Sequence, residues 1–256
     1  MRITIIFGLL AMLLTEGRAQ GPPVFTDTPI MLGLAGKGVR TFGHFQSSDA
    51  LRSYTQVIAI PYNVGTDFQV GGVVRYVSKN PASGESQSGL GDLTIFFKQL
   101  LIQKDGAGKT FRALIKATPT IPVGNDNVVP PLGAGVWRGG LGLVAGYITT
   151  DFGIYLEVGH VLVEQRADHS TFSAALSVPV LPQKYPPQQI NLSLDVFGTV
   201  GPERKNDVWL APGLQWITGK RFLVEAGISL PLTEGDLAEQ ERTDFAFRAG
   251  LRYLFY

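Results

Sequence analysis

The sequence TDFAFRAGLRYLFY, residues Thr243 to Tyr256, ends the chain and repeats with a period of two. The charged side chains lie on one phase: Asp244, Arg248 and Arg252. The other phase is apolar and mostly aromatic, and consists of Phe245, Phe247, Ala249, Leu251, Tyr253 and Phe255. A period of two indicates a β-strand with two unlike faces. In a membrane the apolar face would meet lipid and the charged face a wet lumen, whereas a soluble sheet would bury the apolar face against a second layer.

The composition argues against a helical membrane protein. The chain has 256 residues with 31 Gly, no Cys, 17% charged residues and a mean hydropathy of only +0.14. Soluble domains carry roughly 25% charged residues. The longest runs without a charge after the N-terminus, Ser53–Thr66 and Ser170–Gln183, have 14 residues each. A membrane-spanning helix needs about 20 apolar residues, so these runs predict none.

The N-terminus has the features of a signal peptide, residues 1–19. A basic Arg2 precedes the apolar run Ile3–Leu14, and Gly17 and Ala19 supply the small residues that a signal peptidase requires, so we expect cleavage after Ala19. The alternative is a short membrane anchor, for which the apolar run is too short. Cleavage lowers Lys plus Arg from 22 to 20 and Asp plus Glu from 21 to 20. The neutral mature chain predicts no nucleic-acid partner, and the lack of Cys predicts no disulfide framework.

The rest of the chain predicts one all-β domain. Residues 20–38 contain three prolines and are expected to be a periplasmic lead-in, which lies in the periplasm or tucks under the barrel. Residues 39–256 are expected to form a β-barrel. Twelve strands are expected at roughly 39–47, 53–61, 67–78, 91–103, 110–121, 139–150, 152–165, 170–181, 189–201, 207–218, 221–231 and 243–256. Their lengths of about ten residues suit a tilted bilayer crossing. Which phase of Leu90–Gln103 faces inward stays open, since Phe96 and Phe97 occupy both phases.

The connections between these strands favour an antiparallel transmembrane β-barrel over a soluble sandwich. Most connections after even-numbered strands are tight, as at Lys104–Lys109, whereas Ser78–Leu90, Pro122–Arg138 and Leu232–Arg242 are long and polar. Short turns on one side and long loops on the other are typical of outer-membrane barrels. An unpaired strand edge costs several kcal/mol per polar group in hydrocarbon, so the sheet must close.

Single charges on the second phase of several strands are the candidate lumen-lining residues. These are Arg75, Arg112, Lys116, Glu157, Asp195, Glu225, Arg248 and Arg252. They could line a pore and set its selectivity, or they could pair and fill a narrow barrel. Trp137, Trp209, Trp216 and the tyrosines are expected in the aromatic girdle at the membrane interface, with a cradle for a hydrophobic ligand as the alternative.

The sequence contains no motif that predicts a catalytic, cofactor or metal site. The tripeptide Asp168-His169-Ser170 invites a hydrolase interpretation, but adjacent residues in a strand or turn point apart and cannot form a triad with one another. His44, His160 and His169 are the three histidines, and no two of them have ligand spacing.

Three stretches resemble one family of outer-membrane proteins, grouped under the meta-pathway of phenol degradation. Gly21–Pro29 (GPPVFTDTP) is similar to its Gly-Pro-Pro-aromatic-x-Thr-Asp-Asp-Pro opening, with Thr28 in place of the second Asp. Gly89–Leu93 (GLGDL) resembles its Gly-x-Gly-Asp-hydrophobic strand start. Pro119–Asp126 resembles a stretched form of its Pro-Thr-Gly-Asp strand end. The resemblance implies an outer-membrane β-barrel tied to uptake of aromatic or other hydrophobic compounds.

The function expected from these features is passive uptake of small hydrophobic or aromatic molecules through the outer membrane of a Gram-negative bacterium. The expected partners are outer-membrane lipid, the barrel assembly machinery and the solutes themselves. The alternatives are a membrane-embedded lipid hydrolase or acyltransferase, and a structural barrel without an open pore.

Overall fold

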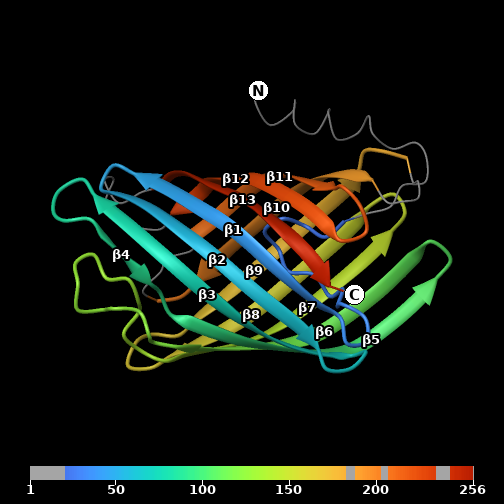
Figure 1. Ribbon diagram of the computed structural model, residues 1–256, viewed down its shortest axis with the longest axis horizontal. Coiled ribbons are helices and arrows are strands. Elements are labelled where there is room, and N and C mark those ends of the chain that lie inside the picture. The colour runs from blue at the N-terminus through green and yellow to red at the C-terminus, as the bar shows by residue number, and fades with distance from the viewer. Residues whose placement is uncertain (1–20, 183–187, 203–206, 235–242, 256) are drawn as a thin grey trace.

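The computed structural model describes residues 21–182, 188–202, 207–234 and 243–255, and shows a closed antiparallel β-barrel (Figure 1). Twelve long strands form the ring, as the sequence predicts. They are β1 (Lys37–Ser48), β2 (Leu51–Asn63), β3 (Phe68–Pro81), β5 (Leu93–Gly106), β6 (Lys109–Ile121), β7 (Arg138–Thr149), β8 (Gly153–Val163), β9 (His169–Pro179), β10 (Gln189–Val200), β11 (Asp207–Ile217), β12 (Phe222–Glu234) and β13 (Thr243–Phe255).

The ring closes at the seam between the first and the last strand. β1 pairs with β2 on one side and with β13 on the other, with Lys37 opposite Phe255. The two ends of the barrel domain therefore lie at one rim, which we call the short-turn end because the turns between β2 and β3, β5 and β6, β7 and β8, and β11 and β12 also lie there. The opposite rim, with the connection 122–137, is the long-loop end.

A short strand that the sequence did not predict, β4 (Gln87–Leu90), pairs with residues 76–79 of β3. β5 pairs with residues 68–73 of β3, so β4 and β5 act as one strand that is interrupted at Gly91 and Asp92. The interruption lies inside the GLGDL stretch and turns the Asp92 carboxylate inward, where its exposed fraction is 5%.

The two faces of the wall differ as the alternation predicts. Outward side chains are apolar and remain exposed, for example Leu143 on β7, Leu156 on β8 and Phe247 on β13. Buried side chains of the wall include many polar and charged residues: Asn63, Gln69, Asp92, Asn191, Asp195, Gln215 and Glu225. β5 has Thr94 buried and Phe97 exposed, and Lys98 reaches the interior, which settles the face of this strand. No helix in the described part of the chain is long and apolar enough to cross a membrane.

The lead-in is placed differently from the expectation. Residues 20–38 are expected in the periplasm or tucked under the barrel, but Gly21 to Pro29 lie inside the ring of strands (Figure 1). Residues 30–36 lead from there to β1 and are more exposed, with Leu34 72% exposed. Val24 has no exposed surface, and Thr26 has 3%. The prolines that argued against strand pairing explain this placement, because a proline lacks the N–H that a ladder needs but can lie in an irregular buried segment. The signal peptide, residues 1–19, and Tyr256 lie outside the described residues.

Candidate functional site

The candidate site is the lumen together with the chain that enters it. We call residues 21–36 the plug segment and residues 24–27 the plug tip. Glycines of the wall make room for the tip: a Cβ at Gly213 would lie 2.8 Å from Val24 Cγ2, and one at Gly227 would lie 2.5 Å from Phe25 Cε2. The wall is thus shaped around the tip on the β11 and β12 side.

Asp27 anchors the tip to the opposite wall. Its carboxylate lies 2.7 Å from Lys98 Nζ and 3.2 Å from Lys116 Nζ, and Lys116 also pairs with Glu157. Burial alone would raise the pKa of Asp27, but the ammonium groups of Lys98 and Lys116 outweigh burial and hold the pKa of this carboxyl far below its usual range. Asp27 is therefore ionised and forms the central anion of this cluster.

Main-chain groups of the tip bind side chains of β1, β10 and β13. The Val24 carbonyl accepts hydrogen bonds from Arg40 Nη2 at 2.8 Å and from Arg248 Nη1 at 3.2 Å. The Thr26 N–H donates to Asp195 Oδ1 at 2.8 Å. Neighbouring Glu225, which has no exposed surface, pairs with Arg40 and with Arg252, at 2.6 and 3.0 Å. The tip is thus held by charge-assisted hydrogen bonds from several strands.

A row of aromatic rings on one side of the lumen includes Phe25 of the plug tip. The Phe25 ring stacks on Phe197 with centroids 5.7 Å apart, and Phe197 stacks on Trp209 at 6.4 Å. The Arg248 guanidinium lies 4.5 Å from the Phe25 centroid and 4.6 Å from that of Phe42. This geometry is a cation–π and ring-stacking site, and the chain's own Phe25 occupies it.

The placement of Trp209 corrects one prediction. It was assigned to the interfacial girdle, but its ring lies in the lumen beside Phe197. The alternation itself contains the signal, because Trp209 is out of phase with Leu210 and Leu214, the second of which faces outward. Trp216 is 50% exposed on the outward phase of the same strand.

Six of the eight candidate residues gather around the plug segment. These are Lys116, Glu157, Asp195, Glu225, Arg248 and Arg252. Arg75 lies nearer the long-loop end and donates to the Asp92 carbonyl and the Thr94 hydroxyl, whereas Arg112 pairs with Asp105 near the short-turn end, at 3.7 Å. Whether they set selectivity remains a prediction.

Three members of the cluster are not among the eight candidates: Asp27, Arg40 and Lys98. Asp27 was missed because the lead-in was expected outside the barrel. Lys98 is a single charge on the second phase of its strand, but two adjacent phenylalanines left open which phase of β5 faces inward. Arg40 could have been found from its phase, since it lies directly opposite Arg252 across the seam.

A second cavity, of about 490 Å³, lies towards the long-loop end. Its charged lining consists of Arg75, Lys79, Arg138, Arg166, Asp92 and Asp168. Asp92 shapes the cavity by accepting from the N–H groups of Gly124 and Ala134 at 3.2 and 2.9 Å and by pairing with Arg138 at 2.9 Å. The GLGDL stretch and the Pro119–Asp126 stretch thus meet at this carboxylate.

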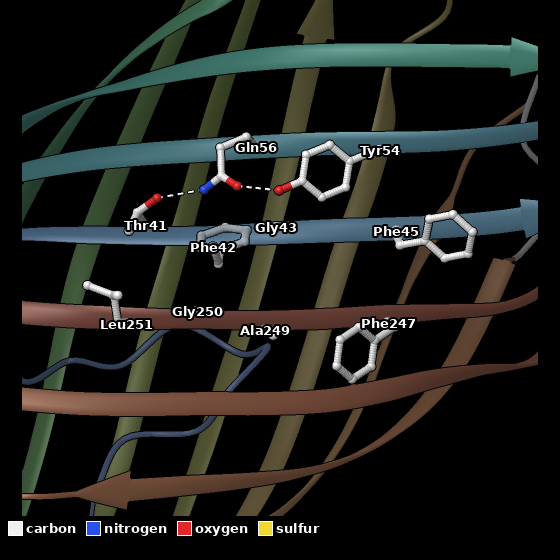
Figure 2. Close-up of a pocket in the computed structure, with 10 residues that line it drawn as sticks. All are labelled: Thr41, Phe42, Gly43, Phe45, Tyr54, Gln56, Phe247, Ala249, Gly250 and Leu251. Carbon is white, nitrogen blue, oxygen red and sulfur yellow. Dashed lines mark hydrogen bonds between the residues drawn. The ribbon is translucent and has the colours of Figure 1, made fainter.

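A third hollow, of about 290 Å³, lies on the outward face of the seam. Figure 2 shows Gln56 lying between Thr41 and Tyr54, with the rings of Phe45 and Phe247 nearby. Gln56 donates to the Thr41 hydroxyl at 2.6 Å. This hollow belongs to the outer wall and does not contact the plug tip.

The hairpin of β8 and β9 brings together a His–Ser pair that the tripeptide Asp168-His169-Ser170 does not indicate. Cross-strand pairing places His160 opposite Ser170, with His160 Nδ1 3.1 Å from Ser170 Oγ. Asp168 Oδ2 lies 3.9 Å from His160 Nε2, which is beyond hydrogen-bond distance. Among the described residues, no group of three His, Cys, Asp or Glu could hold a metal ion.

The structure is similar to that of an outer membrane channel from Pseudomonas putida F1, with a TM-score of 0.68 and 12% identity over 92% of this chain and 99% of that chain. It is also similar to the KdgM porin in complex with disordered oligogalacturonate, with a TM-score of 0.54 and 10% identity over 85% of this chain and 99% of that one. The NanC porin gives 0.52 and 8% identity over 84% and 98%. At these identities the likeness shows the fold alone, and no curated protein matches the sequence.

A family model described as "Putative MetA-pathway of phenol degradation" matches residues 33–247. This range covers most of the barrel domain, from the end of the plug segment into β13. The Gly89–Leu93 and Pro119–Asp126 stretches lie within the matched range, whereas Gly21–Pro29 lies before it. The family resemblance is confirmed, and the chain belongs to this family.

Proposed function

We propose that the protein is a passive outer-membrane channel for small hydrophobic or aromatic molecules. The observation that carries the proposal is the aromatic row in the lumen, in which the Phe25 ring contacts both Phe197 and the Arg248 guanidinium. An aromatic solute offers the same flat face and can take the place of Phe25 on Phe197, at a stacking energy of about 0.5–1.5 kcal/mol per ring pair. The long-loop end would face outward and the short-turn end the periplasm, as in barrels of this type.

The mechanism is exchange rather than chemistry. The plug segment fills the lumen while it is docked, so solute passes when the tip leaves its site and the solute takes over its contacts. A solute that repeats some of those contacts lowers the free-energy cost of displacing the tip. Catalysis has no part in this scheme.

Liposome swelling tests the channel with two solutes that cross lipid slowly, L-phenylalanine and L-leucine. We expect wild-type protein to admit phenylalanine faster than leucine, although phenylalanine is larger. Phe197→Leu should bring the ratio of the two initial rates close to one. The matched control is Phe245→Leu, which removes an outward ring that is 40% exposed and should leave the ratio unchanged.

Absence of swelling with either solute, in wild type and in Phe25→Ala alike, would favour the structural barrel without an open pore. A ratio that survives Phe197→Leu would place aromatic selection elsewhere.

A second candidate function, lipid hydrolysis, has one supporting observation, the contact between His160 and Ser170. The pair lies on the outward face near the long-loop end, where lipid is accessible. The Asp168 carboxylate does not reach hydrogen-bond distance of the ring, so the orienting member of a triad is missing from its place. Release of fatty acid by wild type and its loss in both Ser170→Ala and His160→Ala would establish this activity.

A further inference from the structure

On the inner face of the barrel, cross-strand pairing places residues of like charge directly opposite one another. Lys98 on β5 lies opposite Lys116 on β6, and Arg40 on β1 lies opposite Arg252 on β13. Like charges at opposed positions of an antiparallel pair destabilise the sheet. Each pair therefore needs an anion placed between its members.

The two pairs obtain their anions from different sources. Glu225, a residue of the wall, serves the arginine pair. The lysine pair shares Asp27, which comes from the plug segment, and only Lys116 has a further partner in Glu157. A docked plug is thus required for the lysine pair to be neutralised.

Withdrawal of the plug segment changes the charge of the lumen. Five cations surround the tip: Arg40, Lys98, Lys116, Arg248 and Arg252. With the tip docked they face four carboxylates, of Asp27, Glu157, Asp195 and Glu225, and without it they face three. The vacated lumen has two cations in excess, and its wall also offers Phe197, on which an aromatic ring stacks.

The cavity of about 490 Å³ near the long-loop end also has more cations than carboxylates. Its lining carries four cations and two carboxylates, and Asp92 is already engaged by Arg138 and two main-chain N–H groups. Lys79 and Arg166 donate to main-chain carbonyls of the 122–137 connection, of Pro131 and Ala134. Arg75 and Arg138, two like charges, both line this cavity. An anion that enters from the long-loop end therefore meets a second cationic site first.

From this arrangement we propose that the lumen binds small aromatic carboxylates, which displace the plug tip because they carry the two groups it presents, a ring and a carboxylate. The ring takes the place of Phe25 on Phe197, and the carboxylate takes the place of Asp27 between Lys98 and Lys116. The proposal rests on the proposed channel function and names the class of its solute. It differs from uptake of uncharged aromatic compounds, for which the excess cations would give no advantage.

Calorimetry on the mature protein in detergent tests the proposal at low ionic strength, where screening is weakest. The probes are hydrocinnamate and its neutral amide, hydrocinnamamide, which share a phenyl ring on a short flexible chain. We expect the acid to bind about tenfold more tightly than the amide, as charge-assisted hydrogen bonds imply. Lys116→Gln should remove most of this preference, and Arg52→Gln, which removes an exposed cation near the long-loop rim, should not.

A gain of affinity provides the decisive readout, because a misfolded variant could not produce it. Asp27→Asn weakens the hold of the tip on both lysines, so hydrocinnamate should bind about tenfold more tightly than to wild type. Asp151→Asn, in the exposed turn between β7 and β8, is the matched control and should change nothing.

Two results would overturn the inference. The first is equal affinity of wild type for the acid and the amide, and the second is an unchanged affinity for the acid in Asp27→Asn. Either could occur while phenylalanine still passes faster than leucine in the swelling assay, in which case the channel function stands and only the carboxylate class fails. If swelling is also absent, the channel function fails with it.

Discussion

At the scale of single residues, Asp27 connects the plug segment to the barrel. It joins two lysines that would repel each other without it, and it lies two positions from the ring that fills the aromatic site. The sequence motif that contains it could be recognised as a family signature. Its position in space could not be predicted, because the long-range pairing with Lys98 and Lys116 depends on closure of the whole ring.

Asp27→Asn should loosen the plug segment. The variant keeps the shape of the side chain but loses both ion pairs, and Lys116 then keeps Glu157 as its carboxylate partner. Removing one partner of a buried pair leaves an uncompensated charge, whose cost falls with the partial exposure of this site. In planar bilayers we expect the open events to become several-fold more frequent than in wild type. Asp151→Asn should retain the wild-type frequency, and a similar rise in both variants would refute the role of Asp27.

The lowered pKa of Asp27 predicts how docking depends on pH. A carboxyl with a folded-state pKa below its ordinary value of 3.8 stabilises docking at all pH values above that figure, and the stabilisation is lost only as the pH falls through the lower, folded-state pKa. The groups facing Asp27 are Lys98 on β5 and Lys116 on β6, with Glu157 on β8 behind the latter. The difference in open frequency between wild type and Asp27→Asn should therefore persist from pH 7 to about pH 4. Its disappearance near pH 5 would show that the two lysines do not hold the carboxylate.

At the scale of elements, the strands were predictable and the plug segment was not. Alternation of apolar and polar residues is a local signal, and it gave all twelve strands of the ring. β4 escaped prediction because Gly91 and Asp92 interrupt the period. The plug segment has no period at all, since its neighbours are side chains of many strands rather than a ladder partner.

The seam between β1 and β13 is tightly packed on its inner face. A Cβ at Gly250 would lie 2.5 Å from the Thr41 carbonyl oxygen and 2.4 Å from Phe42 Cβ, so a larger residue must push the two backbones apart. Gly250→Val should destabilise the barrel by about 1–3 kcal/mol, as overpacking does elsewhere. The temperature at which the folded band disappears in heat-modifiability gels measures the loss.

Its matched control is Ala249→Val, the next residue on the same strand. Ala249 lines the outward hollow of about 290 Å³, which has room for two more methyl groups. We expect a change below about 0.5 kcal/mol, typical of surface positions. Equal destabilisation by both substitutions would mean that strand propensity rather than close approach limits the seam.

The cost of placing a charged side chain on the outward face should depend on how deep in the bilayer the residue lies. Leu143 lies in the middle of β7 and is 53% exposed, so Leu143→Arg places a guanidinium near the bilayer midplane at a cost of about 2–4 kcal/mol. Leu162 is equally exposed but lies one residue from the end of β8, where Leu162→Arg should cost about 0–1 kcal/mol. Urea unfolding in lipid vesicles compares the two, and equal costs would argue against a membrane around this belt.

At the scale of the whole molecule, the barrel and the plug segment are separable. Every long strand has two strand neighbours, and none of these ladders uses residues 21–36. The fold class followed from the sequence because closure is the only solution for apolar, outward-facing strands in lipid. The filled lumen did not follow, because nothing local distinguishes an inserted segment from a periplasmic one.

Deletion of residues 22–35 should therefore leave a folded barrel with a wider path. We expect the β-sheet signal in circular dichroism to be retained and the single-channel conductance to rise several-fold over wild type. A variant that fails to fold would show that the plug segment is needed as a core, and unchanged conductance would place the constriction in the wall itself.

The position of the plug segment also bears on the order in which the barrel can be assembled. The segment directly precedes β1, and β1 pairs with β13, so the residues that fill the interior are synthesised before any strand of the ring, and β13, which encloses them, after the other eleven. Until that strand arrives, the sheet is an open trough and the segment can settle sideways onto its inner face. Afterwards it can enter only end-on, past the ring of turns beside Lys37. The plug segment must therefore be in place before β13 pairs with β1 and closes the barrel. A bulky group attached to this segment would be most harmful at that closing step.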